Sequence, residues 1–202
     1  MSARVSVLGA GAWGATLAWL IAREGREVAL WSSSADKRDA MRTHRAAPGV
    51  PLALPEAVHI VDTLAEAMAP GLVFLAIPPG VFRSLARDFA AHVRPDHRLV
   101  HTVKALEPGG RALSTVLVEE TCALQVGALV GPVLPKEVWR GDEMAAVVGS
   151  RHRAVCVEAG AVLNGPSLKV YGSTDLVGVE VSGAMRTPIG LAAGMVRGAG
   201  LG

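Results

Sequence analysis

The sequence predicts an α/β protein: a Rossmann-type, doubly wound and mainly parallel sheet, followed by a long helix. Three observations predict this fold. Short runs of Val, Leu and Ile alternate with helical stretches, half of the residues are hydrophobic while only 4% are aromatic, and a glycine-rich turn follows the first expected strand. Strands alternating with helices pair in parallel through right-handed crossovers. Ligands are then expected at the carboxyl edge of the sheet.

Short apolar runs bounded by turn residues are the expected strands. They lie at Arg4–Leu8, Glu27–Trp31, Val58–Val61, Leu72–Ile77, Arg98–Val103, Gly127–Val130, Met144–Val148 and Leu168–Tyr171. Helices are expected between most of them, at Ala12–Glu24, Asp36–Arg45, Thr63–Met68 and Val81–His92. Gly25, Pro70 and Pro95 mark the ends of three helices, because glycine readily ends a helix and proline cannot continue one.

From Asp175 onward the sequence changes to a long run without strand-bounding turns. We predict one long helix there, kinked at Pro188, because proline removes a helical hydrogen bond and clashes with the preceding turn. The chain is therefore expected to hold a dinucleotide-binding domain at residues 1–174. Residues 175–202 are expected to form the first helix of a helical C-terminal domain that is truncated or missing.

Charge and composition exclude several classes of partner. The net charge is +2, and the sequence contains no run of five like charges that could bind a nucleic acid backbone. No nucleic acid partner is therefore expected. The two cysteines show no metal-ligand spacing, and no metal site is expected. The uncharged run Val5–Ala22 contains three glycines, which indicate strand, turn and helix rather than a membrane span. A cytoplasmic protein is expected.

The turn after the first strand reads Gly9-Ala10-Gly11-Ala12-Trp13-Gly14. This G-x-G-x-x-G pattern gains specificity from its context, because it follows a strand and opens a helix. Gly9 allows the tight turn, Gly11 lets the backbone approach a pyrophosphate, and Gly14 lets the helix pack on the strand. The helix N-terminus then faces the anion. The alternative is a glycine-rich turn without a ligand.

The end of the second strand bears on which dinucleotide is bound. A carboxylate there binds the ribose 2′-hydroxyl of NAD. This chain has Trp31-Ser32-Ser33-Ser34 instead, with Lys37 and Arg38 nearby. No carboxylate is present there to repel a 2′-phosphate, and the hydroxyls and cations could bind one. This pattern favours NADP(H) over NAD(H). The alternative is that the serines cap the following helix.

Two further segments lie where cofactor and substrate are expected. The fourth strand ends in Ala76–Gly80, whose two prolines make a rigid loop, with simple packing as the alternative. Lys104 follows the fifth strand, where substrate is expected in this topology, although an exposed lysine is usually only solvated. His101 is a candidate general acid or, more commonly, a core histidine.

Together these residues resemble the bacterial-type NAD(P)-dependent glycerol-3-phosphate dehydrogenases. The resemblance rests on Val7–Gly14, Leu30-Trp31, Thr102-Val103-Lys104, Val130-Gly131-Pro132 with Glu137-Val138, and Asp175–Glu180 with Gly183-Ala184. It implies hydride transfer between NAD(P)H and dihydroxyacetone phosphate or sn-glycerol 3-phosphate. The implied substrate is therefore small and phosphorylated, and a homodimer is left open.

The expected site combines the resemblance with the patterns above. Cofactor contacts are expected at Gly9, Gly11, Ala12, Trp13, Gly14, Ser33, Ser34, Lys104 and Pro135. Substrate contacts are expected at Lys104, Gly131 and Val133, and catalytic roles at Lys104 and Arg186.

Two departures from the family keep other functions open. Arg186 fills the position of the family's proton-exchanging lysine, and an arginine side chain does not release a proton as a buried lysine can. Val133 replaces a family serine in the substrate loop. The first hypothesis is an oxidoreductase in which Lys104 positions substrate and Arg186 acts electrostatically. The alternatives are a catalytically decayed NAD(P)-binding module and a related Rossmann reductase with a changed substrate.

Overall fold

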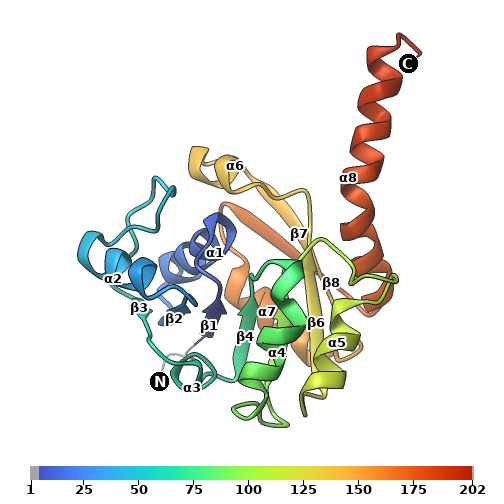
Figure 1. Cartoon of the computed structure of the whole chain (residues 1–202). Coiled ribbons are helices and arrows are strands. Elements are labelled where there is room, and N and C mark those ends of the chain that lie inside the picture. Colours follow the sequence, from blue (N-terminus) through green and yellow to red (C-terminus); the bar gives the residue numbers. More distant parts are fainter. Residues whose placement is uncertain (1–4, 202) are drawn as a thin grey trace.

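The computed structural model describes residues 5–201 and has one eight-stranded sheet in the order β3-β2-β1-β4-β5-β6-β7-β8 (Figure 1). The strands are β1 Val5–Leu8, β2 Val28–Trp31, β3 Val58–Ile60, β4 Leu72–Leu75, β5 Arg98–His101, β6 Gln125–Val130, β7 Met144–Gly149 and β8 Leu168–Ser173. Neighbours pair in parallel except β6 and β7, which are antiparallel. The predicted Rossmann-type, mainly parallel sheet is confirmed.

Helices lie on both faces of this sheet. They are α1 Ala12–Arg23, α2 Ala35–His44, α3 Leu64–Ala67, α4 Phe82–Ala90, α5 Leu113–Glu120, α6 Pro135–Arg140, α7 Arg153–Leu163 and α8 Leu176–Gly198, with a 3₁₀ turn η1 at Pro79–Val81. Strand side chains alternate between the faces, so Val7 enters one core with α1 and α7, whereas Leu8 enters the other with α4 and α5. The order of the strands reverses between β1 and β4, which is where a doubly wound sheet binds its ligand.

Several predicted strand limits differ from the structure. The strands expected to reach Ile77 and Val103 end earlier, at Leu75 and His101, where the chain leaves the sheet for the loops at its carboxyl edge. The first strand was expected from Arg4, which lies outside the described residues. The expected β6 and β8 are extended to Gln125 and Ser173.

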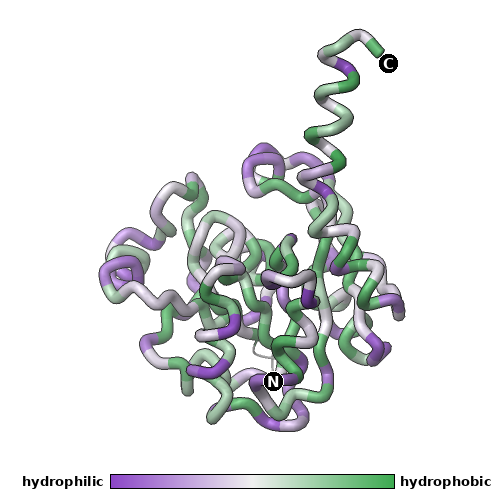
Figure 2. Tube along the Cα trace, turned by 45° about the vertical axis from the view of Figure 1, so that its right-hand side comes forward, coloured by the Kyte–Doolittle hydropathy of each residue, from purple (hydrophilic) through white to green (hydrophobic). Residues whose placement is uncertain are grey.

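Helix α8 confirms the predicted long helix. The side chain of Asp175 caps it by accepting a hydrogen bond from Gly178 N at 2.8 Å. The helix continues through Pro188, and all residues from 187 to 201 are exposed. This second half projects from the body of the molecule, and apolar residues are spread along it (Figures 1 and 2). Within residues 5–201, no helix is both long and apolar enough to cross a membrane.

Candidate functional site

Two glycines of the turn between β1 and α1 are required by close packing. Gly9 has φ of +106°, and a Cβ there would lie 2.2 Å from the carbonyl oxygen of Ala76. A Cβ on Gly14 would lie 1.7 Å from the carbonyl oxygen of Gly9. Backbone atoms of β1, α1 and the end of β4 therefore meet at distances that only glycine permits. These contacts set the shape of the turn.

Gly11 differs from the other two glycines because no protein atom explains it. A Cβ at Gly11 would meet nothing within 4 Å, and its φ of −73° suits any residue. Gly11 and Ala12 are exposed at the N-terminus of α1, where no side-chain cap binds the first N–H groups. Such an end offers N–H donors and a positive dipole to an anion. The open space is therefore where a pyrophosphate fits.

A groove of about 410 Å³ runs from this turn along the carboxyl edge of the sheet. Its lining includes Gly9, Ala10, Gly11, Trp13, Trp31, Ser32, Ser33, Lys37, Ala76, Ile77, Pro78, Val81, Leu85, Thr102 and Val103. The groove thus joins the predicted phosphate turn to the end of β2 on one side and to the end of β5 on the other. Lys104 is the next residue after this lining. An elongated ligand in the groove would reach the neighbourhood of Lys104.

At the end of β2, some polar groups form hydrogen bonds within the protein, and others line the groove. Ser34 Oγ accepts a hydrogen bond from Lys37 N at 3.3 Å and caps α2, so the capping interpretation is correct for this serine. Arg38 donates to Ser32 O at 2.6 Å and to Asp62 Oδ1 at 3.2 Å. The exposed Ser33 and the Lys37 ammonium both line the groove.

Lys104 lies in a second centre, beyond the end of β5. Its Nζ is partly buried and donates to the carbonyl oxygen of Val133 at 3.1 Å. Burial, followed by the positive charge of Arg186, lowers the pKa of Lys104 from 10.5 to about 8, against the opposing charge of Glu137. The structure therefore brings together groups from β5, the loop after β6, α6 and α8.

Arg186 marks the end of the covered part of α8, since every later residue through 201 is exposed. It lines a cavity of about 650 Å³ between α8, the end of β6, Val147 of β7 and the end of β8. Gly131, Pro132, Ser173, Asp175 and Ser182 are among the other residues that line it. A cation at the rim of a cavity this size can bind an anionic or carbonyl-bearing ligand.

The predicted substrate loop contributes backbone more than side chains. Val133 is only 4% exposed and its side chain packs in the core, so the group it offers to Lys104 is its carbonyl oxygen. A Cβ on Gly131 would lie 2.6 Å from Ala145 O, which explains that glycine by packing on β7. Pro135 begins α6, where its missing N–H is not needed.

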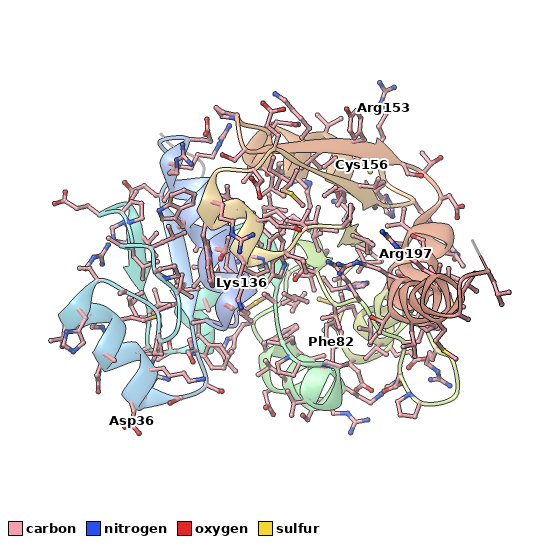
Figure 3. All side chains as sticks on the ribbon, turned by 90° about the horizontal axis from the view of Figure 1, so that it is seen from above. Asp36, Phe82, Lys136, Arg153, Cys156 and Arg197 are labelled. Atoms are coloured by element: carbon pink, nitrogen blue, oxygen red, sulfur yellow. The ribbon has the colours of Figure 1, made fainter. Side chains whose placement is uncertain are left out.

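Helix α6 connects this loop to α1. Trp139 Nε1 donates to Thr16 Oγ1 at 2.8 Å, and Thr16 Oγ1 donates to Ala12 O at 2.7 Å. In the view down onto the carboxyl edge, Lys136 on α6 lies between Asp36 on α2 and Arg197 on α8 (Figure 3). The loop beside Lys104 is thereby anchored to the helix that opens the phosphate turn.

A buried polar cluster, which sequence reasoning did not identify as a site, holds α8 to the sheet. Glu180 is 3% exposed, and its Oε1 lies 2.9 Å from His101 Nε2 and accepts from Ser114 N at 2.9 Å. Ser114 Oγ donates to Glu180 Oε2 at 2.5 Å. Burial raises the pKa of the Glu180 carboxyl, but hydrogen bonds from His101 and Ser114 outweigh it and the pKa is lowered.

The fully buried position of His101 agrees with the core interpretation. Glu180 stands in the quoted motif Asp175–Glu180, and a carboxylate in an otherwise apolar stretch of helix was the available signal. No cluster of three or more metal-ligating side chains occurs within residues 5–201.

The site therefore combines a glycine turn at a helix N-terminus, a groove along the switch point and a lysine after β5. The family model for the N-terminal part of NAD-dependent glycerol-3-phosphate dehydrogenase matches residues 4–156. The chain belongs to this family. The resemblance inferred from the sequence motifs is confirmed.

Relatives and solved structures agree with this assignment. The chain is 36% identical to a glycerol-3-phosphate dehydrogenase [NAD(P)+] of Geobacter sulfurreducens, over 100% of this chain and 62% of that protein. It is 33% identical to the Streptomyces griseus protein of the same name, over 98% of this chain and 61% of that protein. The crystal structure of glycerol-3-phosphate dehydrogenase from Coxiella burnetii matches with a TM-score of 0.86 and 27% identity, over 100% of this chain and 63% of that one.

The chain thus spans about three fifths of the length of these relatives.

Proposed function

We propose that this chain is the cofactor-binding part, with the beginning of the next domain, of an NAD(P)-dependent glycerol-3-phosphate dehydrogenase. The reaction is hydride transfer between NAD(P)H and dihydroxyacetone phosphate, or its reverse from sn-glycerol 3-phosphate. The observation that carries this proposal is the continuity of the groove, which runs from the open space at Gly11 to Thr102 and Val103, immediately before Lys104.

The residues of the groove suit a dinucleotide. Gly9, Gly11, Ala12, Trp13 and Gly14 would hold the pyrophosphate at the N-terminus of α1. When bound, the nicotinamide supplies or takes up a hydride. We assign Pro135 to the same binding face because it begins the helix that Trp139 anchors to α1.

Two cations suit a phosphorylated carbonyl substrate. The positive charge of Arg186 lowers the pKa of Lys104, and a doubly charged phosphate would offset the repulsion between the two cations. Lys104 has two N–H groups left after its bond to Val133 O, and Arg186 can donate to an oxygen through its planar fork. Gly131 lines the adjoining cavity, so substrate there would touch the loop backbone.

For the cofactor, we propose NADP(H) over NAD(H). Ser33 and Lys37 line the groove at the end of β2, whereas Ser34 and Arg38 are engaged within the protein. A hydroxyl and an ammonium would receive the 2′-phosphate. Titration by nucleotide fluorescence should show about tenfold tighter binding of NADPH than of NADH. K37E should abolish that difference; equal affinities in the unchanged protein would refute the preference.

The reaction is tested by following NADPH oxidation upon addition of dihydroxyacetone phosphate to the full-length enzyme that contains this chain. Turnover is expected, with sn-glycerol 3-phosphate as the product. Cofactor binding without any turnover would contradict the proposed dehydrogenase.

A decayed cofactor-binding module is the second candidate, and Arg186 in place of the family's lysine favours it. It predicts NADP(H) binding with no turnover until R186K and V133S are introduced together. A related reductase with a changed substrate is favoured by the apolar Val133 and would oxidise NADPH with another 2-keto compound.

We also propose a division of the chain into two domains, at residues 1–174 and 175–202. We further propose a homodimer, which analytical sedimentation would detect.

A further inference from the structure

We propose that Lys104, and not Arg186, exchanges the proton with the substrate oxygen in this chain. This inference rests on the proposed dehydrogenase function, since reduction of a carbonyl requires a proton donor beside the reacting oxygen. The second centre contains two cations from different elements, one after β5 and the other on α8.

The chemistry of the two side chains separates their roles. A guanidinium delocalises its charge over three nitrogens and stays protonated at every pH at which a protein is folded. Arg186 therefore supplies a constant positive charge and hydrogen-bond donors. An ammonium loses its proton readily when it is buried beside another cation. Only Lys104 can alternate between acid and base.

The position of Lys104 suits that role. Its Nζ donates a hydrogen bond to the carbonyl oxygen of Val133 at 3.1 Å, and the side chain of Val133 is packed in the core. A single carbonyl leaves two N–H directions of the ammonium for a ligand. The preceding residue, Val103, lines the groove, and Nζ of Lys104 reaches the loop after β6 at Val133 O.

The surrounding charges tune this lysine in opposite directions. Burial and the charge of Arg186 lower the pKa of Lys104 to about 8, whereas Glu137 raises it. Glu137 Oε2 is buried without a hydrogen-bond partner among the described residues, so no other donor offsets its effect on Lys104. On β5 and α8, His101 Nε2 and Ser114 N both hydrogen-bond to Glu180 Oε1, whereas His101 Nδ1 is buried without a partner among the described residues.

The proposed step balances protons and electrons. When bound, the reduced nicotinamide supplies a hydride, with its electron pair, to the carbonyl carbon. The π pair of the C=O bond moves to oxygen, an O–H bond forms there, and an N–H bond of the Lys104 ammonium breaks. Lys104 is left as a neutral amine and regains a proton from water. In the reverse direction, the neutral amine accepts the hydroxyl proton of the substrate.

The first test measures the lysine directly and does not depend on turnover. The lysines of the full chain are ¹³C-methylated and titrated by NMR, with the Lys104 signal assigned through K104R. The expected titration midpoint for the unchanged chain is near pH 8. R186Q should raise this midpoint and E137Q should lower it, because the two charges act in opposite directions. K169R, on the exposed face of β8, is the matched control and should leave it unchanged.

The second test measures the reaction. In the direction of substrate oxidation, kcat/KM should rise with pH to a plateau above about pH 8, and R186Q should move this rise to higher pH along with the NMR midpoint. K104R retains the positive charge but should lower kcat by at least about 100-fold, the usual contribution of a general acid or base. Its affinity for the cofactor should stay within a few fold.

The possible outcomes are distinct. A Lys104 midpoint at 10 or above, or K104R retaining the kcat of the unchanged chain, overturns the role of Lys104 while leaving the dehydrogenase function intact. Absence of turnover in the unchanged chain, with cofactor bound, overturns the proposed function and this role with it. A midpoint near 8, shifted by R186Q and accompanied by loss of turnover in K104R, supports the proposal.

Discussion

Two regions lie on the same edge of the sheet but are assembled differently: the predicted phosphate turn, Gly9–Gly14, and the second centre around Lys104, which is the cation centre. The turn is made by residues within Gly9–Gly14 and one neighbouring carbonyl, that of Ala76. The cation centre joins Lys104, Val133, Glu137 and Arg186, which come from four separate segments. The proposed cofactor site is thus encoded locally, whereas the proposed reaction centre depends on how α8 and α6 dock.

Breaking the attachment of α8 should have the largest effect. Glu180→Ala leaves His101 and the Ser114 N–H buried without their acceptor, and we expect it to lower the free energy of unfolding by about 3 kcal/mol. Urea denaturation measures this loss. Because the native pKa of Glu180 is lowered, its contribution is present above the ordinary carboxyl range and is lost as pH falls through the native value.

The exposed Glu143→Ala is the control and should change the free energy of unfolding by less than about 0.5 kcal/mol. A Glu180→Ala protein as stable as the unchanged chain at pH 7 would show that this cluster does not hold α8.

Gly14→Ala tests whether the phosphate turn depends on packing. The new Cβ would meet Gly9 O at 1.7 Å, so the turn must open, at a cost of about 2 kcal/mol in stability. Thermal denaturation and cofactor titration should both be affected. Unaltered stability would mean that helix α1 can move away from β1 more easily than the contact suggests.

Gly11→Ala is the matched change at the ligand side of the same turn. No protein atom lies within 4 Å of the new Cβ, so the melting temperature should stay the same or rise slightly. The methyl group occupies the space of the pyrophosphate, and we expect about tenfold weaker NADPH binding by fluorescence titration. Unchanged binding would remove the dinucleotide from this position.

Lys104→Met tests whether the lowered pKa of Lys104 reduces the stability of the protein at neutral pH. The native pKa near 8 lies below the ordinary 10.5, so burial of the ammonium costs stability below pH 8, and this cost disappears as pH rises from 8 to 10.5. The variant should be more stable than the unchanged chain by about 3 kcal/mol at pH 7, since a tenfold change in proton affinity is about 1.4 kcal/mol, and most of this difference should be lost by pH 10.5. Denaturation at both pH values measures it; a pH-independent difference contradicts the lowered pKa.

Much of the fold could be predicted because its signals are local. The apolar runs, the glycines of Gly9–Gly14 and the change of pattern at Asp175 lie within short stretches of sequence, and the structure has strands, turn and long helix there. Helix α5 illustrates what could not be predicted. Its N-cap position, Ala112, has no capping side chain, and the acceptor for Ser114 N is Glu180 on α8. A capping pattern in the sequence is absent because the cap is tertiary.

The sequence by itself determined the strands, helices α1 to α4 and α8, the glycine turn and the presence of Lys104 and Arg186, since each depends on periodicity or on a motif of neighbouring residues. The tertiary structure decided which groups share one environment. It buried the side chain of Val133 and turned its carbonyl to Lys104, used Ser34 as a cap, and set Arg186 and Glu137 around the lysine. Burial and charge act through space, and neither follows from spacing along the chain.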